Sequence, residues 1–304
     1  MFESLFAERG LSLDRMRVIV ELQNAGSIAE AAPGDVVRQS QFSRQLRELS
    51  QFFGCELVQR RGKVLKLTQR GEELAAIVRQ QLRALEDFHA ECRSEQTIFS
   101  IGSGDSLVQW LVIPRLGAAT DSSRGARFST SSLRTNEIIR QLSDCRLDFG
   151  LVRKNAVAPG LKSSVLGKLT YVAMIPKTLA TSNKATPTLR DVLGALPLAM
   201  QTTDGQFTTQ LREIAQSLGV AARPALSCQS FPQTMAAVRS GRFAAVLPQI
   251  AVTELGGTAV HIVSDPLLKR LEREIALTWN PRSLRVRPGA DIALARIQAA
   301  LKFR

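Results

Sequence analysis

The first 95 residues repeat their hydrophobic side chains with the spacing of helices. Ser12 can cap a first helix that Gly26 ends, and Ser27 with Glu30 has the S-x-x-E form of a capping box that begins a second helix. Pro33-Gly34 limits this second helix to a turn or two. A third helix follows, and its apolar stripe faces a core: Phe42, Leu46, Leu49 and Phe53.

Two short stretches after Gly54, residues 55–60 and 64–68, flank Arg61-Gly62-Lys63 and predict a hairpin with a basic tip. Thr68 can cap a long helix that runs to about Glu95. The spacing of a coiled-coil seam recurs along it in Leu74, Val78, Gln81, Leu85, Phe88 and Cys92. This helix packs either on its own domain or on a partner helix. Its length and its polar surroundings favour a dimer, through Leu74, Val78, Leu85 and Phe88.

The pattern changes at Thr97, where short apolar runs begin to alternate with amphipathic stretches. The expected strands are "TIFSIGSG", "ARFSTSS", "LDFGLVR", "LTYVAMIPK", "ALPLAMQ", "FAAVLPQ" and "EIALTW". The expected helices are "LVQWLVIPRLGAA", "TNEIIRQLSD", "TQLREIAQSLG" and "FPQTMAAVRSG". Such alternation predicts an α/β domain with mostly parallel sheets, built as one domain or as two lobes.

Charge and composition narrow the function. The formal net charge of +13 lies entirely in residues 96–304, because basic and acidic side chains balance in residues 1–95. A basic cleft for an anionic effector and a scattered basic surface both account for this excess, and the spread of the residues over many loops favours the surface. No apolar run is long enough to span a membrane, and the N-terminus lacks the features of a signal peptide, which predicts a cytoplasmic protein.

The residues that usually carry enzymatic chemistry are sparse. The four cysteines are far apart and form no C-x-x-C, and only two histidines are present, so no metal or cofactor is expected. Reduced structural thiols are the simplest role for the cysteines, with a redox sensor as the alternative. The motifs G-x-S-x-G, G-x-G-x-x-G and the P-loop are absent from the sequence, which indicates a protein that is not an enzyme.

Three helices with a tight turn before the third, followed by a basic hairpin, are typical of a winged helix-turn-helix. A helix that enters the major groove, ~12 Å wide, needs short polar and arginine side chains toward the base edges. The third predicted helix carries such side chains off its apolar face: Gln39, Ser40, Gln41, Ser43, Arg44 and Arg47. An ordinary solvated helix face is the alternative for this stretch taken alone.

The wider context resembles the LysR-type transcriptional regulators. The resemblance rests on "GSIAEAA" and "SRQLRELSQFFGCELVQRRGKVLKLTQRGEELA", with a gap-free interval from Gly26 to Ser43, and continues more weakly through "RLDFGLV", "VRSGRFAAVLP" and "REIALTW". It implies an α/β architecture with an N-terminal winged helix-turn-helix (1–68), a linker and dimerisation helix (69–95) and an effector-binding domain (96–304). This last domain has the two-lobed form of periplasmic binding proteins, with lobe I at about 96–170 and 272–304 and lobe II at about 171–271.

The resemblance also implies partners and site residues. The partners are double-stranded operator DNA, a small-molecule effector, RNA polymerase, and further copies of the chain in a homodimer or homotetramer. The residues expected to bind DNA are Ser27, Arg38, Gln39, Ser40, Gln41, Ser43, Arg44, Arg47, Arg60, Arg61 and Lys63. Arg38 stands where the family commonly has serine, so either Ser40 or Asp35 is left to cap the third helix.

The effector is expected at "IGSGDS", where a strand passes through a glycine-rich turn into a helix whose N-terminus favours an anion. The resemblance places the effector pocket there, between residues of the two lobes: Ser103, Gly104, Asp105, Thr130, Ser131, Thr202, Thr203 and Ser230. Asp105 suits an anion poorly, so it either caps the helix or binds a polar or cationic group. A solute-binding protein, and a regulator controlled by another protein, are the remaining alternatives.

Overall fold

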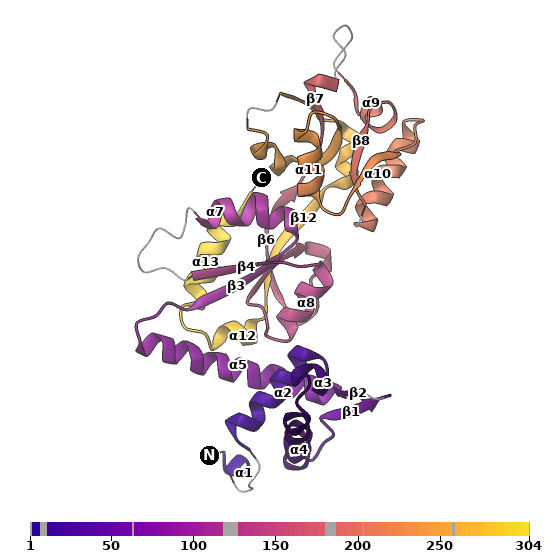
Figure 1. Ribbon diagram of the computed structural model, residues 1–304. Coiled ribbons are helices and arrows are strands. Elements are labelled where there is room, and N and C mark those ends of the chain that lie inside the picture. The colour runs from indigo at the N-terminus through magenta and orange to yellow at the C-terminus, as the bar shows by residue number, and fades with distance from the viewer. Residues whose placement is uncertain are drawn as a thin grey trace. The chain divides into compact units, whose positions relative to one another are not determined.

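The computed structural model describes residues 2–6, 11–62, 64–117, 127–179, 187–202, 204–256 and 259–303 (Figure 1). The chain forms two compact units. The first contains Met1–Thr97, Arg140–Asp148 and Asn280–Ala290, and the second contains Ile98–Ile139, Phe149–Trp279 and Asp291–Arg304. Two short segments from the C-terminal two thirds of the sequence therefore belong with the N-terminal residues.

The first unit is mainly helical. Its elements are α1 (Glu3–Phe6), α2 (Leu13–Ala25), α3 (Ile28–Ala31), α4 (Val36–Phe53), β1 (Val58–Arg61), β2 (Val64–Leu67), α5 (Gln69–Cys92) and α12 (Pro281–Arg285). The predicted caps are confirmed, because the Ser12 hydroxyl accepts the Arg15 N–H and the Ser27 hydroxyl accepts the Glu30 N–H. Gly26 ends α2 in the left-handed conformation, with φ of 84°.

Helix α4 begins at Val36, directly after the Pro33-Gly34 turn. The Asp35 carboxylate caps it, since it accepts the Arg38 N–H at 2.9 Å. Between the two caps left open by the sequence, the structure therefore selects Asp35. Phe42, Leu46 and Leu49 are buried as the periodicity predicts, and they hold α4 against a core shared with α2 and α5.

Strands β1 and β2 form the predicted antiparallel hairpin, in which Arg61 pairs with Val64 across a turn at Gly62, whose φ is 64°. Thr68 caps α5 by accepting the Gly71 N–H. Gly71 itself has a steric role, because a Cβ atom built there would lie 2.1 Å from the Leu57 carbonyl oxygen. This close approach holds the first turn of α5 against the chain that enters the hairpin.

Helix α5 divides its apolar residues between two faces, which corrects the predicted seam. Val78 is only 3% exposed and belongs to the core of the first unit, and Leu74 packs on the same core. Ile77, Leu85 and Phe88 are exposed instead. The 4-3-4 spacing alone does not tell the buried residues of α5 from the exposed ones. A helix that packs on its own domain near one end and is exposed near the other can carry apolar residues on both faces.

A buried cluster of charges joins α5 to the two late segments of the first unit. The Arg287 guanidinium donates to both Asp87 oxygens at 2.7 and 2.9 Å, and its Nη1 lies 2.6 Å from Asp148. Arg83 also pairs with Asp148 at 3.3 Å and donates to the Arg146 carbonyl oxygen. These contacts fix α5 to residues that lie far from it in sequence.

The second unit holds most of the strands. They are β3 (Ile98–Ser103), β4 (Arg127–Ser132), β5 (Phe149–Arg153), β6 (Lys162–Leu169), β7 (Tyr171–Pro176), β8 (Leu198–Gln201), β9 (Pro224–Cys228), β10 (Ala245–Pro248), β11 (Val260–Val263) and β12 (Arg273–Trp279). Strands β6, β9 and β11 were not predicted from the sequence. Each of these strands mixes exposed with partly buried residues and lacks a continuous buried run.

The strands form a five-stranded sheet of order β4-β3-β5-β12-β6, a three-stranded sheet of order β10-β7-β11 and a β8–β9 pair. The expectation of mostly parallel sheets is only partly correct. Pairs β3–β4, β3–β5 and β8–β9 are parallel, but β12 is antiparallel to both of its neighbours, and so is β7. The chain leaves the five-stranded sheet through β6 and returns through β12, so these two strands run in opposite directions.

Helices accompany these sheets, as Figure 1 shows for α8 and α13 beside the five-stranded sheet. The helices are α6 (Asp105–Leu107), the π-helix η1 (Val108–Val112), α7 (Ile113–Gly117), α8 (Thr135–Ser143), α9 (Leu189–Gly194), α10 (Gly205–Ser217), α11 (Phe231–Arg239) and α13 (Ala290–Leu301). The remaining turns, η2 (Lys154–Ala156), η3 (Lys177–Leu179), η4 (Gln249–Glu254) and η5 (Pro266–Leu271), are 3-10 helices. No helix in the described residues is long and apolar enough to cross a membrane.

Candidate DNA interface and effector site

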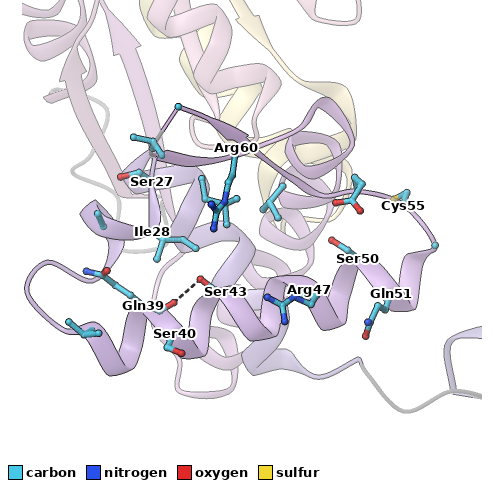
Figure 2. Close-up of a pocket in the computed structure, with 18 residues that line it drawn as sticks. Ser27, Ile28, Gln39, Ser40, Ser43, Arg47, Ser50, Gln51, Cys55 and Arg60 are labelled. Atoms are coloured by element: carbon cyan, nitrogen blue, oxygen red, sulfur yellow. Dashed lines mark hydrogen bonds between the residues drawn. The ribbon is translucent and has the colours of Figure 1, made fainter.

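A groove of about 1250 Å³ lies between α4, the start of α3 and the β1–β2 hairpin (Figure 2). Its lining mixes polar and apolar side chains in similar numbers and includes six of the residues that were predicted to bind DNA: Ser27, Gln39, Ser40, Ser43, Arg47 and Arg60. Figure 2 shows Ser40 and Arg47 along α4, with Arg60 above them from the hairpin. The fold thus gathers side chains from three elements on one concave surface.

Internal hydrogen bonds hold part of this surface in place. The Gln39 side chain donates to the Ala32 carbonyl oxygen at 2.8 Å, and the Ser43 hydroxyl donates to the Gln39 carbonyl oxygen at 3.0 Å. The first bond ties α4 to the end of α3 across the Pro33-Gly34 turn. Gln39 therefore holds the turn in place, and its amide oxygen and second amide N–H are left to face a ligand.

Four of the described residues that were predicted to bind DNA lie outside the groove lining: Arg38, Gln41, Arg44 and Arg61. Arg38 and Gln41 line a separate hollow of about 370 Å³ on another side of α4, where Arg38 pairs with Glu21 at 3.2 Å and stacks on Phe42. Arg61 follows Arg60 at the hairpin turn but is not part of the groove lining. The alternation of side chains along a strand explains why two adjacent arginines point to different faces. Lys63 lies outside the described residues.

Arg44 is exposed on α4 and pairs with Glu48 at 2.9 Å, one turn along the helix. Glu48 also pairs with Arg15 at 2.7 Å. The hydrogen bond from Arg44, together with the charge of Arg15, holds the pKa of Glu48 below its usual range. The charge of Arg44 is therefore partly neutralised by Glu48, whereas Arg47 lines the groove.

The predicted effector residues of the first lobe surround the end of β3. Ser103 is fully buried and its hydroxyl has no hydrogen-bond partner among the described residues. Gly104 caps α6, and the Asp105 carboxylate accepts the Ser132 hydroxyl at 3.4 Å, so Asp105 does not serve as the cap. Thr130 and Ser131 lie exposed on the edge strand β4, opposite Ile101 and Gly102.

The predicted residues of the second lobe lie at the ends of β8 and β9. Both the N–H and the hydroxyl of Thr202 donate to the Cys228 carbonyl oxygen, at 3.0 and 3.4 Å. Ser230 caps α11 by accepting the Gln233 N–H at 3.3 Å. Helix α11 contacts α6, which brings Ser230 to the side of the unit that carries the Ser103 turn. Thr203 lies outside the described residues.

Two features that hold this site together were missed in the sequence. Trp110 is buried among residues of the three-stranded sheet and α11, and its indole N–H donates to Glu254. Gln109 donates to the same carboxylate at 3.0 Å, and Arg239 lies 3.5 Å from its other oxygen. The helix that follows the Ser103 turn is thus fastened to the second lobe. The sequence signal for this contact is Trp110 itself, one of two tryptophans in the chain, because a large aromatic side chain with an N–H donor is usually buried against a partner.

The second missed feature is an aromatic cluster of Tyr171, Phe207 and Phe231, whose ring centroids lie 4.9 to 6.0 Å apart. Phe231 directly follows Ser230 and is the first residue of α11. Burial raises the pKa of Tyr171 above its ordinary value. The cluster supports the start of α11 and, with it, the position of Ser230.

The described residues contain no group of three or more His, Cys, Asp or Glu side chains that could hold a metal ion. The four cysteines are free, with Cys145 and Cys228 buried, Cys55 half-buried and Cys92 exposed. Burial raises the pKa of the Cys145 thiol, which leaves it in its less reactive, protonated form.

Comparisons with known proteins agree with this arrangement. Residues 13–72 match the family described as "Bacterial regulatory helix-turn-helix protein, lysR family", and residues 93–296 match "LysR substrate binding domain". A curated relative, the Escherichia coli (strain K12) "Uncharacterized HTH-type transcriptional regulator YnfL", is 26% identical over 193 residues. The matched region spans 60% of this chain and 63% of that relative's length.

Solved structures share the fold. A full-length OxyR variant from Pseudomonas aeruginosa aligns over 97% of this chain and 96% of its own, with 17% identity and a TM-score of 0.65. Full-length CbnR complexed with its target DNA aligns over 92% of this chain and 100% of its own, with 17% identity and a TM-score of 0.55. Since the two family matches together cover most of the chain, the protein belongs to the LysR family of bacterial helix-turn-helix regulatory proteins.

Proposed function

We propose that this protein is a transcriptional regulator that binds specific sequences in double-stranded DNA and responds to a small molecule bound by its C-terminal domain. The observation that carries the proposal is the groove between α4 and the β1–β2 hairpin, in which Ser40, Arg47 and Arg60 are gathered. Such side chains pair with base edges and phosphates. The DNA-bound structure of CbnR, which shares the fold, supports the same use of this unit.

The proposed activity is binding, without catalysis. Family membership supports this, since the relatives are described as regulatory proteins. A bacterial regulator that binds chromosomal DNA acts in the cytoplasm, so we propose that location for this protein. RNA polymerase remains the proposed partner through which bound DNA would affect transcription.

Replacing Arg47 by alanine tests the DNA-binding proposal. We expect binding to weaken by about 1–3 kcal/mol if Arg47 contacts a base, with relaxed preference at one position. If it contacts a phosphate, binding to all sequences should weaken and the dependence of affinity on salt should become less steep. Fluorescence anisotropy with an operator selected from random duplexes, repeated at several salt concentrations, measures both.

Arg93→Ala is the matched control, because Arg93 is exposed at the far end of α5 and the change removes the same charge. It should retain wild-type affinity at every salt concentration. Equal affinities of Arg47→Ala and wild-type protein at matched salt would contradict the proposed role of the groove.

The effector is proposed to bind at the turn formed by Ser103 and Gly104, near the start of α11. The buried Ser103 hydroxyl, which has no partner among the described residues, supports this placement, because a buried polar group normally has one. The Ser230 cap and Thr202 lie on the second lobe of the same unit. A ligand with hydrogen-bonding groups would satisfy the Ser103 hydroxyl.

Ser103→Ala separates ligand binding from folding. We expect the ligand-free variant to be as stable as wild type or slightly more stable, because the change removes an unsatisfied buried hydroxyl. Thermal-shift assays against metabolite pools should give a ligand that raises the melting temperature of the wild type, and a smaller rise in the variant. An equal rise in both proteins would exclude Ser103 from the effector site. Failure of every metabolite would favour control by another protein.

The regulator is proposed to act as a homodimer through the exposed face of α5. Ile77, Leu85 and Phe88 supply apolar surface there, and exposed apolar surface of this kind is typical of protein interfaces. A homotetramer, which the family resemblance implies, remains a prediction.

A further inference from the structure

Two large aliphatic side chains at the start of α4 are exposed to solvent. Val36 is 76% exposed and Val37 is 68% exposed. Valine has a low helix propensity, and exposed aliphatic surface is unfavourable in water. Neither helix propensity nor packing in a core therefore explains why valine occupies both positions. They are the first two residues of an 18-residue helix whose other exposed positions are mostly polar or charged.

Val36 belongs to the groove. It lines the same surface as Gln39, Ser40, Ser43 and Arg47, and it lies about one helical turn before Ser40. With 3.6 residues per turn, Val36, Ser40 and Arg47 fall within about a quarter of the helix circumference. Val37 lines the other hollow, beside Arg38 and Gln41. A ligand that covers the groove face of α4 therefore covers Val36 as well.

The start of α4 is not built to hold a phosphate. Helix N-termini bind anions through their free N–H groups, but here the Asp35 carboxylate already accepts the Arg38 N–H at 2.9 Å. Asp35 also adds a negative charge that repels phosphate. This helix end therefore offers DNA the apolar side chain of Val36. Such a side chain suits the edge of a base better than the charged sugar-phosphate backbone.

We propose that Val36 contacts the C5 methyl group of a thymine in the major groove and so determines sequence preference. The inference rests on the proposed DNA-binding function and deepens it. The thymine methyl is the apolar group that the major groove presents in its pattern of donors and acceptors. Contact between it and Val36 removes apolar surface of both partners from water, which favours thymine over other bases at that position.

Replacing thymidine by deoxyuridine in the operator tests the contact with this one methyl group. Deoxyuridine differs from thymidine only by lacking the C5 methyl, so every hydrogen-bonding group of the base pair is kept. Each thymine of an operator selected with the full-length protein is replaced in turn, and dissociation constants are measured by fluorescence anisotropy. We expect one replacement to weaken wild-type binding about fourfold, the effect of one buried methyl group. The same replacement should change binding by Val36→Ala by less than about 1.5-fold.

Two further variants provide controls. Leu13→Ala removes an aliphatic side chain that is 57% exposed and lies outside both hollows, so it should keep the wild-type sensitivity to deoxyuridine. If Val37→Ala, and not Val36→Ala, abolishes the sensitivity, the assignment to Val36 is overturned. If no deoxyuridine replacement weakens wild-type binding to its selected operator, the methyl contact is rejected while the DNA-binding function stands. If no preferred sequence can be selected, the proposed function itself fails.

Discussion

Replacing Arg287 by alanine is expected to destabilise the first unit by about 3–5 kcal/mol, although Arg287 is 200 residues from the helix it holds. The guanidinium is buried between Asp87 and Asp148, and its removal leaves Asp87 without its bidentate partner. Burying an unpaired carboxylate is far more costly than losing an exposed ion pair, because the interior does not solvate the charge as water does.

The electrostatics of the cluster support this expectation. Burial alone would lower the pKa of Arg287, but the hydrogen bond to Asp87 and the charge of Asp148 outweigh it, so the pKa is raised. The neighbouring Arg79 shows the opposite balance. Its pKa falls to about 10, because burial and the charges of Arg146 and Arg83 oppose its protonated form. Arg287 is thus the cation that the two aspartates stabilise.

The measurement is thermal unfolding followed by circular dichroism at 222 nm. Both tryptophans, Trp110 and Trp279, belong to the second unit, so their fluorescence reports that unit separately. At about 2–4 °C per kcal/mol, the variant should lose roughly 10 °C in the helical transition. Arg285→Ala, which removes an exposed arginine two residues earlier, should shift the transition by no more than about 0.5 kcal/mol.

A double variant tests the pairing itself. Arg287→Ala combined with Asp87→Ala should destabilise less than the sum of the single changes, since neither charge is then left buried without its partner. If the two changes are additive, or if Arg287→Ala melts with the wild type, the cluster does not hold α5 in solution.

Local signals in the sequence predicted much of the first unit. The caps at Ser12 and Thr68, the turn at Gly62 and the apolar stripe of Phe42 and Leu46 each depend on residues within a few positions of one another. Such short-range patterns report local backbone preference and the buried face directly. The start of α4 is the exception, because Arg38 stands where the family commonly has serine and both Asp35 and Ser40 can cap a helix.

Other parts depend on contacts that leave no local pattern. The pairing of Asp87 with Arg287 joins distant parts of the sequence, and each residue alone looks like an ordinary surface charge. The same holds for Val78, whose spacing fits a seam but whose burial is decided by the domain that α5 touches. In the candidate effector site, Trp110 and Glu254 lie 144 residues apart. Tertiary contacts, which the periodicity of the sequence does not reveal, determine whether these residues are buried and what they contact.

Dimer formation through α5 leads to the last prediction. Phe88 is 63% exposed and Leu85 is 53% exposed, and the two lie about one turn apart, away from the buried Asp87 contact. If this face meets a second copy, Phe88→Lys or Leu85→Lys places a charge in an apolar seam, which costs several kcal/mol unless it is paired. Sedimentation velocity should show dimers for the wild type and monomers for both variants.

The loss should extend to DNA. Two linked DNA-binding units gain avidity of about 10²–10⁴ over one, so a monomeric variant should lose affinity of this order for an operator with two half-sites. Glu86→Lys is the matched control, because Glu86 is exposed outside the proposed seam and receives the same side chain. It should remain dimeric. Val78→Ala should lower the melting temperature through its buried position and also remain dimeric. Intact dimers of both Phe88→Lys and Leu85→Lys would show that the subunits associate through another surface.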